Sequence, residues 1–296
     1  KTQHSNSCCL YFLSSSITNF FVLTFGFFVR ILEYGFNVRP DDQILSICKI
    51  RYYLSHTAYF QSTYFIVMAC IDRCAACSIN RKYRKYCNSI IACRIILIII
   101  LSGFLSHIQM LIWFETDDIL NEFNQHETRC YARKGTYRLI FDMFFLIFYS
   151  IGPTLLMSIF GIITMYNIRH LRRQIKPVFN STNRRLVKRK DFQLILMMLI
   201  QILFVIILTF PFALEKFYST LTENYIKSRL KLSWENLVKS IVILLLYINH
   251  SLSFYIYTLS GTSFRKEFYH IVQITFRRFL ERRSKHFGNS LFTIDL

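Results

Sequence analysis

The sequence predicts an all-α integral membrane protein: a bundle of spanning helices over residues 1–261, followed by an amphipathic helix and tail over 262–296. Hydrophobic residues make up 53% of the 296 residues and charged residues only 18%, whereas soluble domains carry about 25% charged residues. The apolar residues gather in stretches of about 20 or more, the length that a helix needs to cross a bilayer. Six such stretches cover about 8–29, 50–71, 90–114, 139–166, 192–214 and 237–260.

The first three stretches have no charged face along most of their length, which is typical of helices that lie in lipid or inside a bundle. The stretch 8–29 contains Asn19 among apolar and hydroxyl side chains. The second stretch ends at the neighbouring charges Asp72 and Arg73, and the third begins within the basic segment 81–94. We therefore expect a membrane boundary close to Asp72-Arg73.

The last three stretches carry helix-bending and polar residues. Pro153 and Pro211 lie inside the fourth and fifth stretches, and a proline inside a helix removes a backbone donor and allows a bend. Polar residues of the sixth stretch are Asn249, Ser253 and Tyr257. Beyond it, residues 264–285 have the pattern of a basic amphipathic helix on a membrane surface.

The basic residues predict the orientation. Most of the 36 Lys and Arg residues lie at Lys1 and in the segments 81–94, 169–190 and 265–285. Such enrichment marks the cytoplasmic side, so we expect a multi-pass plasma-membrane protein with both ends of this chain in the cytoplasm. Basic clusters beside membrane spans contact anionic lipid, and for that reason nucleic acid is not an expected partner.

The segment "ACIDRCAACS", residues 69–78, allows two interpretations. Its three cysteines, Cys70, Cys74 and Cys77, have the spacing of an iron–sulfur motif, while Asp72-Arg73 is a charged pair at the end of an apolar helix. A motif is supported by its structural context, and this chain lacks the alternating strands and helices of a radical enzyme. The sequence therefore favours the charged pair, and predicts neither a cofactor nor an enzyme.

Two cysteines, Cys48 and Cys130, are expected on the outer face, where disulfides persist. A bridge between them is the simplest interpretation, and two unpaired thiols are the alternative. At the inner face, a contact between Arg73 and Asp191 would hold two helices together. The alternative is that Arg73 extends to the lipid headgroups.

Several segments together resemble the rhodopsin-like (class A) G-protein-coupled receptors. Asp72-Arg73-Cys74 is similar to the Asp-Arg-Tyr motif of that family, and residues 249–257 resemble its Asn-Ser-x-x-Asn-Pro-x-x-Tyr motif. The positions of Cys48 and Cys130 match its conserved outer disulfide, Pro153 and Pro211 match its kinking prolines, and Ser263-Phe264-Arg265-Lys266 resembles the start of its eighth helix. The resemblance covers helices two to seven, which implies that the first helix is absent from this chain. The chain departs from the family where Cys74 replaces Tyr and Ser253-Phe254 replaces Asn-Pro.

The resemblance implies roles for individual residues. The activation switch would consist of Asp72, Arg73, Asp191, Pro211, Asn249, Ser253 and Tyr257. Candidates for the ligand pocket are Ser55, Tyr59, Phe210 and Glu215. A weak remnant of a sodium site would consist of Asn19, Ser62 and Asn249, but a neutral Asn binds sodium less well than a carboxylate.

The expected partners are an extracellular ligand, a heterotrimeric G protein and membrane lipid. The overall pattern looks closest to invertebrate FMRFamide-like peptide receptors, which implies a peptide ligand. Acidic residues crowd one outer loop, among them Asp117 and Asp118, and would attract a cationic peptide; the alternative is that they only solvate the loop. A polytopic transporter is the alternative function. Asp142 and His250 are then either polar contacts inside the bundle, which we favour, or pocket residues.

Overall fold

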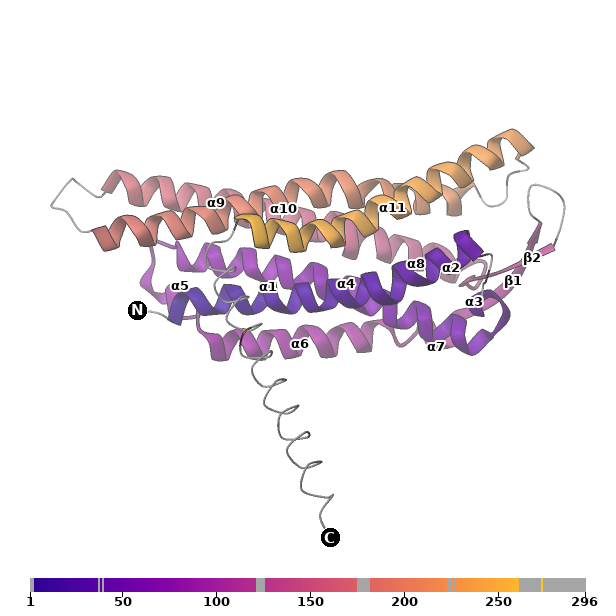
Figure 1. The fold of residues 1–296 in the computed structure, drawn as a ribbon, viewed down its shortest axis with the longest axis horizontal. Coiled ribbons are helices and arrows are strands. Elements are labelled where there is room, and N and C mark those ends of the chain that lie inside the picture. The colour runs from indigo at the N-terminus through magenta and orange to yellow at the C-terminus, as the bar shows by residue number, and fades with distance from the viewer. Residues whose placement is uncertain are drawn as a thin grey trace, which may run out of the picture.

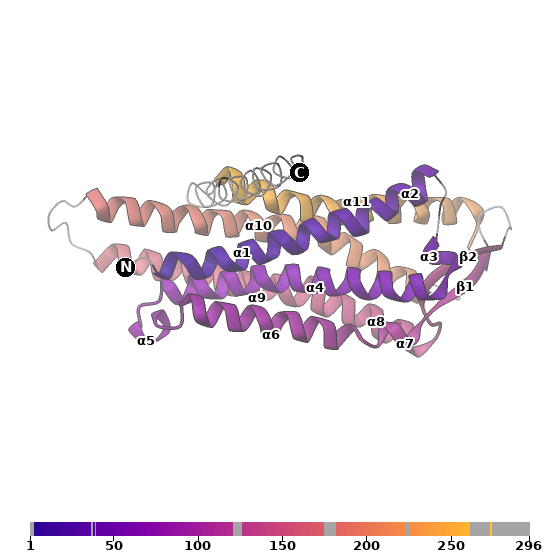
Figure 2. The same ribbon diagram turned by 60° about the horizontal axis from the view of Figure 1, so that its bottom comes forward.

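The computed structural model describes residues 3–36, 38, 40–120, 126–174, 182–222, 225, 227–260 and 273. Long helices lie side by side along one axis, and a two-stranded hairpin covers one end of them (Figures 1 and 2). The all-α membrane bundle predicted from the sequence is confirmed, with the hairpin as an unpredicted addition. The predicted amphipathic helix over 264–285 falls outside the described residues, apart from the single residue Gln273.

The chain enters the bundle through one long helical segment in three parts. These are α1 (Gln3–Phe21), the π-helical turn η1 (Val22–Phe27) and α2 (Phe28–Phe36). A short helix, α3 (Pro40–Gln43), leads into α4 (Leu45–Ala76), the second long helix. With 32 residues, α4 is about 48 Å long and extends along the whole bundle.

A capped turn and a hairpin flank the third long helix. The Asn80 and Asn88 side chains accept hydrogen bonds from backbone N–H groups at the starts of α5 (Arg81–Arg84) and α6 (Ser89–His107). Such caps satisfy donors that have no partner within the helix. The turn α7 (Met110–Trp113) then leads into the antiparallel strands β1 (Phe114–Leu120) and β2 (His126–Ala132).

The fourth long helical segment contains a second π-helical turn. It consists of α8 (Thr136–Phe145), η2 (Leu146–Ile151) and α9 (Gly152–Gln174). The irregular turn comes just before Pro153, which cannot donate a backbone hydrogen bond. Gly152 allows the close approach, because a Cβ atom there would lie 2.7 Å from the Ile147 carbonyl oxygen.

Two further helices complete the described bundle. The helix α10 (Thr182–Leu221) contains Pro211 in its interior, and α11 (Arg229–Ser260) lies beside it. Both extend beyond the predicted stretches 192–214 and 237–260. Consequently, charged residues outside the predicted stretches, such as Lys216 and Glu235, lie on regular helix turns.

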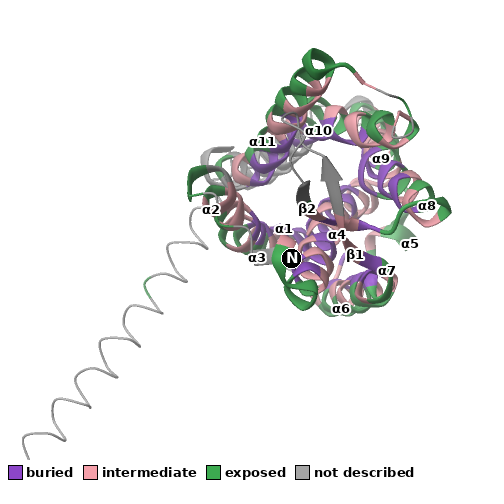
Figure 3. Ribbon diagram, turned by 90° about the vertical axis from the view of Figure 1, so that its right-hand side faces the viewer, coloured by how far each residue is buried: buried purple, intermediate pink, exposed green. Residues whose placement is uncertain are grey.

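The helix α4 lies in the middle of the assembly. It contacts α1, α6 and α9, and in the view along the bundle the other helices surround it with their buried residues turned inward (Figure 3). The outward-facing side chains are largely apolar: Leu105 and Ile162, for example, are 69% and 70% exposed. An apolar outer surface of this kind suits lipid rather than water.

The described residues contain five helical segments that are long and apolar enough to cross a membrane, one fewer than predicted. Their ranges are Ser7–Glu33, Ser89–Trp113, Thr136–His170, Leu199–Leu221 and Arg229–Ser253. The predicted stretch 50–71 is not among them, although it lies within α4. Since α4 packs against other helices, its buried side chains include polar ones such as His56, Gln61 and Ser62, which lower its apolar character.

Candidate ligand cavity and switch residues

A disulfide attaches the hairpin to the bundle. Cys48 on the first turn of α4 is bonded to Cys130 on β2, and their Cα atoms are 5.8 Å apart. The Cys130 N–H also donates to the Asp42 carboxylate at 2.9 Å. The structure thus contains the pairing suggested by the sequence, and we call this part of the molecule the disulfide end. The opposite end, where α4 finishes after Arg73, is called the Arg73 end.

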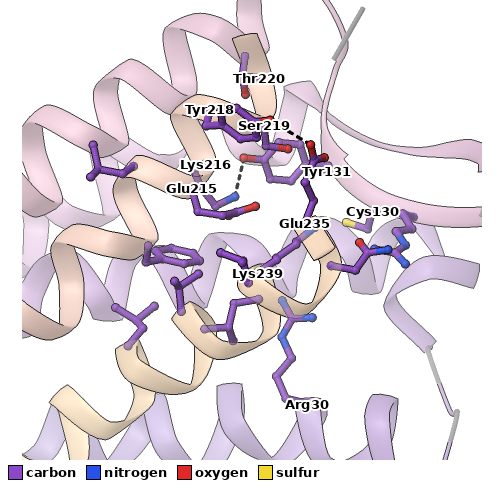
Figure 4. A pocket seen from close by; sticks show the side chains of 18 of the residues that line it. Arg30, Cys130, Tyr131, Glu215, Lys216, Tyr218, Ser219, Thr220, Glu235 and Lys239 are labelled. Carbon is purple, nitrogen blue, oxygen red and sulfur yellow. Dashed lines mark hydrogen bonds between the residues drawn. The ribbon is translucent and has the colours of Figure 1, made fainter. Parts of the chain in front are cut away.

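A cavity of about 990 Å³ lies at the disulfide end, between α4, β2, α10, α11 and the η1–α2 segment (Figure 4). Three of the four predicted pocket residues, Ser55, Tyr59 and Glu215, line it. The fourth, Phe210, is 39% exposed and does not line the cavity. The buried Phe212 lines it instead, since two positions along a helix correspond to a rotation of about 200°.

A chain of hydrogen bonds connects three elements beside the cavity. Lys216 on α10 donates to the Tyr131 hydroxyl at 2.5 Å (Figure 4). This hydroxyl donates to Asp142 on α8, also at 2.5 Å. The second Asp142 oxygen accepts a hydrogen bond from Thr220 on α10. Asp142 is only 1% exposed, so these donors compensate a buried carboxylate.

The tyrosine in this chain remains a hydrogen-bond donor. Burial, and secondly the Asp142 carboxylate, raise the pKa of Tyr131 well above its usual value. The Lys216 ammonium lies 4.0 Å from the centroid of the Tyr131 ring, close enough for a cation–π contact. This network supports the interpretation of Asp142 as a polar contact inside the bundle. Lys216 and Tyr131 were not among the predicted site residues.

The acidic outer loop is paired with cations wherever its side chains are described. Glu115 lies 3.8 Å from Arg133, and Asp117 lies 3.7 Å from Lys134 and 3.3 Å from Arg138. The side chains of the other loop acids, including Asp118, fall outside the described residues. The described acids therefore give little reason to expect attraction of a cationic ligand.

A second polar cluster lies deeper in the bundle, around the predicted sodium-site residues. The Asn19 side-chain oxygen accepts a hydrogen bond from Ser62 and lies 2.7 Å from His250 Nδ1. Asn249 is buried next to the cluster, but His250, rather than Asn249, contacts Asn19. The Asn19 oxygen is already engaged by Ser62 and His250, and an imidazole nitrogen is a poor ligand for sodium, a hard cation that prefers oxygen ligands.

Ser253 has a role in helix packing. Its hydroxyl accepts a hydrogen bond from Gln201 on α10 at 2.8 Å and donates to the Asn249 carbonyl at 3.1 Å. Gln201 is 1% exposed and was not among the predicted residues. A buried glutamine in an otherwise apolar stretch is the signal that could have identified it.

The charged pair at the Arg73 end is buried. Arg73 lies 3.1 Å from Asp72, and the two side chains are 4% and 6% exposed. Asp72 also accepts a hydrogen bond from Ser7 on α1 at 3.1 Å, while Cys87 donates to its backbone carbonyl at 3.3 Å. The carboxylate is thus held by both helices, α1 and α4.

Other predictions for this end concern undescribed side chains. The Asp191 and Tyr257 side chains fall outside the described residues, so their proposed switch contacts stay predictions.

The described part of the chain contains no group of three or more His, Cys, Asp or Glu side chains suited to a metal ion.

Comparison with known protein families agrees with this architecture. The family model described as 7 transmembrane receptor (rhodopsin family) matches residues 1–257 of the 296-residue chain. No curated protein matches the chain. The match covers all five apolar segments, and it favours a multi-pass membrane receptor over the transporter and enzyme alternatives. The chain belongs to the rhodopsin family of seven-transmembrane receptors.

Proposed function

We propose that the protein is a plasma-membrane G-protein-coupled receptor whose agonist is an extracellular peptide bound in the cavity at the disulfide end. The observation that carries this proposal is the cavity itself. Its volume of about 990 Å³ lies at the upper end of the range for small-molecule sites, which is about 300–1,000 Å³. Exposed residues such as Lys231 and Trp234 line its rim, so the end of a longer peptide can enter while the rest stays outside.

The helix α10 provides a route from the cavity to the Arg73 end. Pro211 lines the cavity and interrupts the backbone hydrogen bonds of α10, which gives the helix a point at which to bend. A ligand that binds one bend angle better than another shifts the population of receptor conformations. In the active population, Arg73 leaves its contact with Asp72 and meets the G protein, with Asp191 as a further restraint on the inactive state.

The test uses the full chain, purified in lipid nanodiscs with a heterotrimeric G protein. Pooled synthetic pentapeptides, with free or amidated C-termini, are added and nucleotide exchange is measured. We expect stimulation by at least one pool, which Arg73→Gln abolishes without loss of peptide retention. The proposal would be contradicted if no pool stimulated nucleotide exchange and if the receptor retained no more peptide than empty nanodiscs. Asp191→Asn should raise basal exchange if that residue restrains the inactive state.

A further inference from the structure

We infer that the cavity recognises an anionic group of the ligand, a free C-terminal carboxylate or an Asp or Glu side chain, and that Lys239 on α11 binds it. This inference rests on the proposed function, since it specifies the chemistry of the same peptide. Among the described residues that line the cavity, eight are Lys or Arg and five are Asp or Glu. The excess of cations on this wall favours an anion.

Most of the described carboxylates in the cavity wall already have partners. Ion pairs or hydrogen bonds within 3.3 Å engage Glu33 with Arg30, Asp117 with Arg138, Glu235 with Lys227, and Asp42 with the Cys130 N–H. An incoming cation would have to compete with these contacts. The cavity wall therefore offers little uncompensated negative charge to a cationic peptide.

Lys239 is in a different position. It comes from α11 into the cavity (Figure 4), and within the described residues it has neither an ion pair nor a hydrogen bond. The charged side chains that act on it electrostatically include two cations, Arg129 and Arg30, and two anions, Glu215 and Glu33. Together with Lys239 itself, this set has one more cation than anions. A partly buried ammonium without a hydrogen-bonded anion is costly, and a ligand carboxylate would relieve that cost.

Glu215 is the competing acid. It extends into the cavity from α10 (Figure 4), and Lys216 and Lys239 are the cations that act on it most strongly. No described cation lies within ion-pair distance of its carboxylate. A ligand anion at Lys239 would meet repulsion from Glu215, so neutralising Glu215 should strengthen anion binding. Neutralising Lys239 should therefore weaken anion binding, whereas neutralising Glu215 should strengthen it.

The experiment measures peptide retention on the full chain in nanodiscs by affinity selection and mass spectrometry. Three pentapeptide libraries share neutral side chains: one has free carboxylates, one has amidated ends, and one has amidated ends with a single Asp or Glu. We expect at least one anionic library to be retained about tenfold or more over the neutral amidated library, as for a charge-assisted hydrogen bond. Lys239→Gln should remove this preference, Lys239→Arg should keep it, and Glu215→Gln should increase it.

The control is Lys49→Gln, which removes one positive charge at the same end of the molecule. Lys49 donates to the Ile112 carbonyl at 3.4 Å and does not line the cavity, so its loss should leave the preference unchanged. Equal or better retention of the amidated neutral library, or an anionic preference that survives Lys239→Gln, would overturn the inference while the proposed receptor function stands. Failure of the wild-type chain to retain any library would instead overturn the proposed peptide site, and the inference with it.

Discussion

The hydrogen bond between Tyr131 and Asp142 can be tested by removing one partner at a time. Asp142→Asn keeps the shape of the side chain but leaves a single acceptor oxygen where Asp142 now accepts from both Tyr131 and Thr220. Hydrogen bonds to charged groups contribute about 1.5–3 kcal/mol each. We therefore expect Asp142→Asn to lower the free energy of unfolding by about 2–4 kcal/mol.

The assay is thermal unfolding of the detergent-solubilised chain. A loss of 2–4 kcal/mol lowers the unfolding temperature of a chain of this size by about 5–10 °C. Tyr131→Phe removes the same bond from the other side, so the double variant should lose clearly less than the sum of the two single variants, by about 1–3 kcal/mol.

A hydroxyl without a partner provides the control for this cycle. The Tyr137 hydroxyl is buried on α8, and within the described residues it has no hydrogen bond. Tyr137→Phe removes no hydrogen bond among the described residues and should therefore not destabilise the fold. The reasoning would be refuted if the losses from Tyr131→Phe and Asp142→Asn simply added, or if Tyr137→Phe cost as much as Tyr131→Phe.

Two further predictions concern the backbone and a thiol. Gly152→Ala should destabilise the fold by about 1–3 kcal/mol in the same thermal assay, because its Cβ would meet the Ile147 oxygen, whereas Gly35→Ala, with no atom within 4 Å, should not destabilise it. Burial, and secondly Asp72, raise the pKa of Cys87 to about 12, so its thiol should stay protonated below that pH. At pH 8 we expect N-ethylmaleimide to label Cys93, which is exposed, well before Cys87; equal labelling rates by mass spectrometry would contradict this.

The helix bundle was predictable because lipid imposes a simple requirement. Backbone groups in a bilayer must be paired within a helix or a closed barrel, so long apolar stretches specify helices almost irrespective of their detailed sequence. This reasoning located the cores of α1, α6, α9, α10 and α11. It overestimated the apolar character of α4, since a helix surrounded by protein can carry polar side chains.

The sequence did not predict the β-hairpin, nor which face of α10 lines the cavity. Residues 114–132 are too short and too mixed in polarity for a periodic signal, and their pairing depends on contacts with the rest of the bundle through Cys130. Phe210 was predicted from the family resemblance, and the sequence alone did not show that Phe212, on the other face of the helix, lines the cavity. Lys216 lies just after the predicted stretch 192–214 and Lys239 at the start of the stretch 237–260, and neither was predicted as a site residue. The apolar pattern does not show that α10 and α11 continue past these limits as regular helix.

The positions of the polar contacts on α10 connect the two proposed sites. Toward the disulfide end, Lys216 and Thr220 bind this helix to Tyr131 and Asp142, while toward the Arg73 end Gln201 binds it to Ser253 on α11. Pro211 lies between these two attachments. Under the proposed function, a ligand anion bound to α11 would act on one side of the bend while the Gln201 contact holds the other side. Binding could then favour one bend angle of α10 over another.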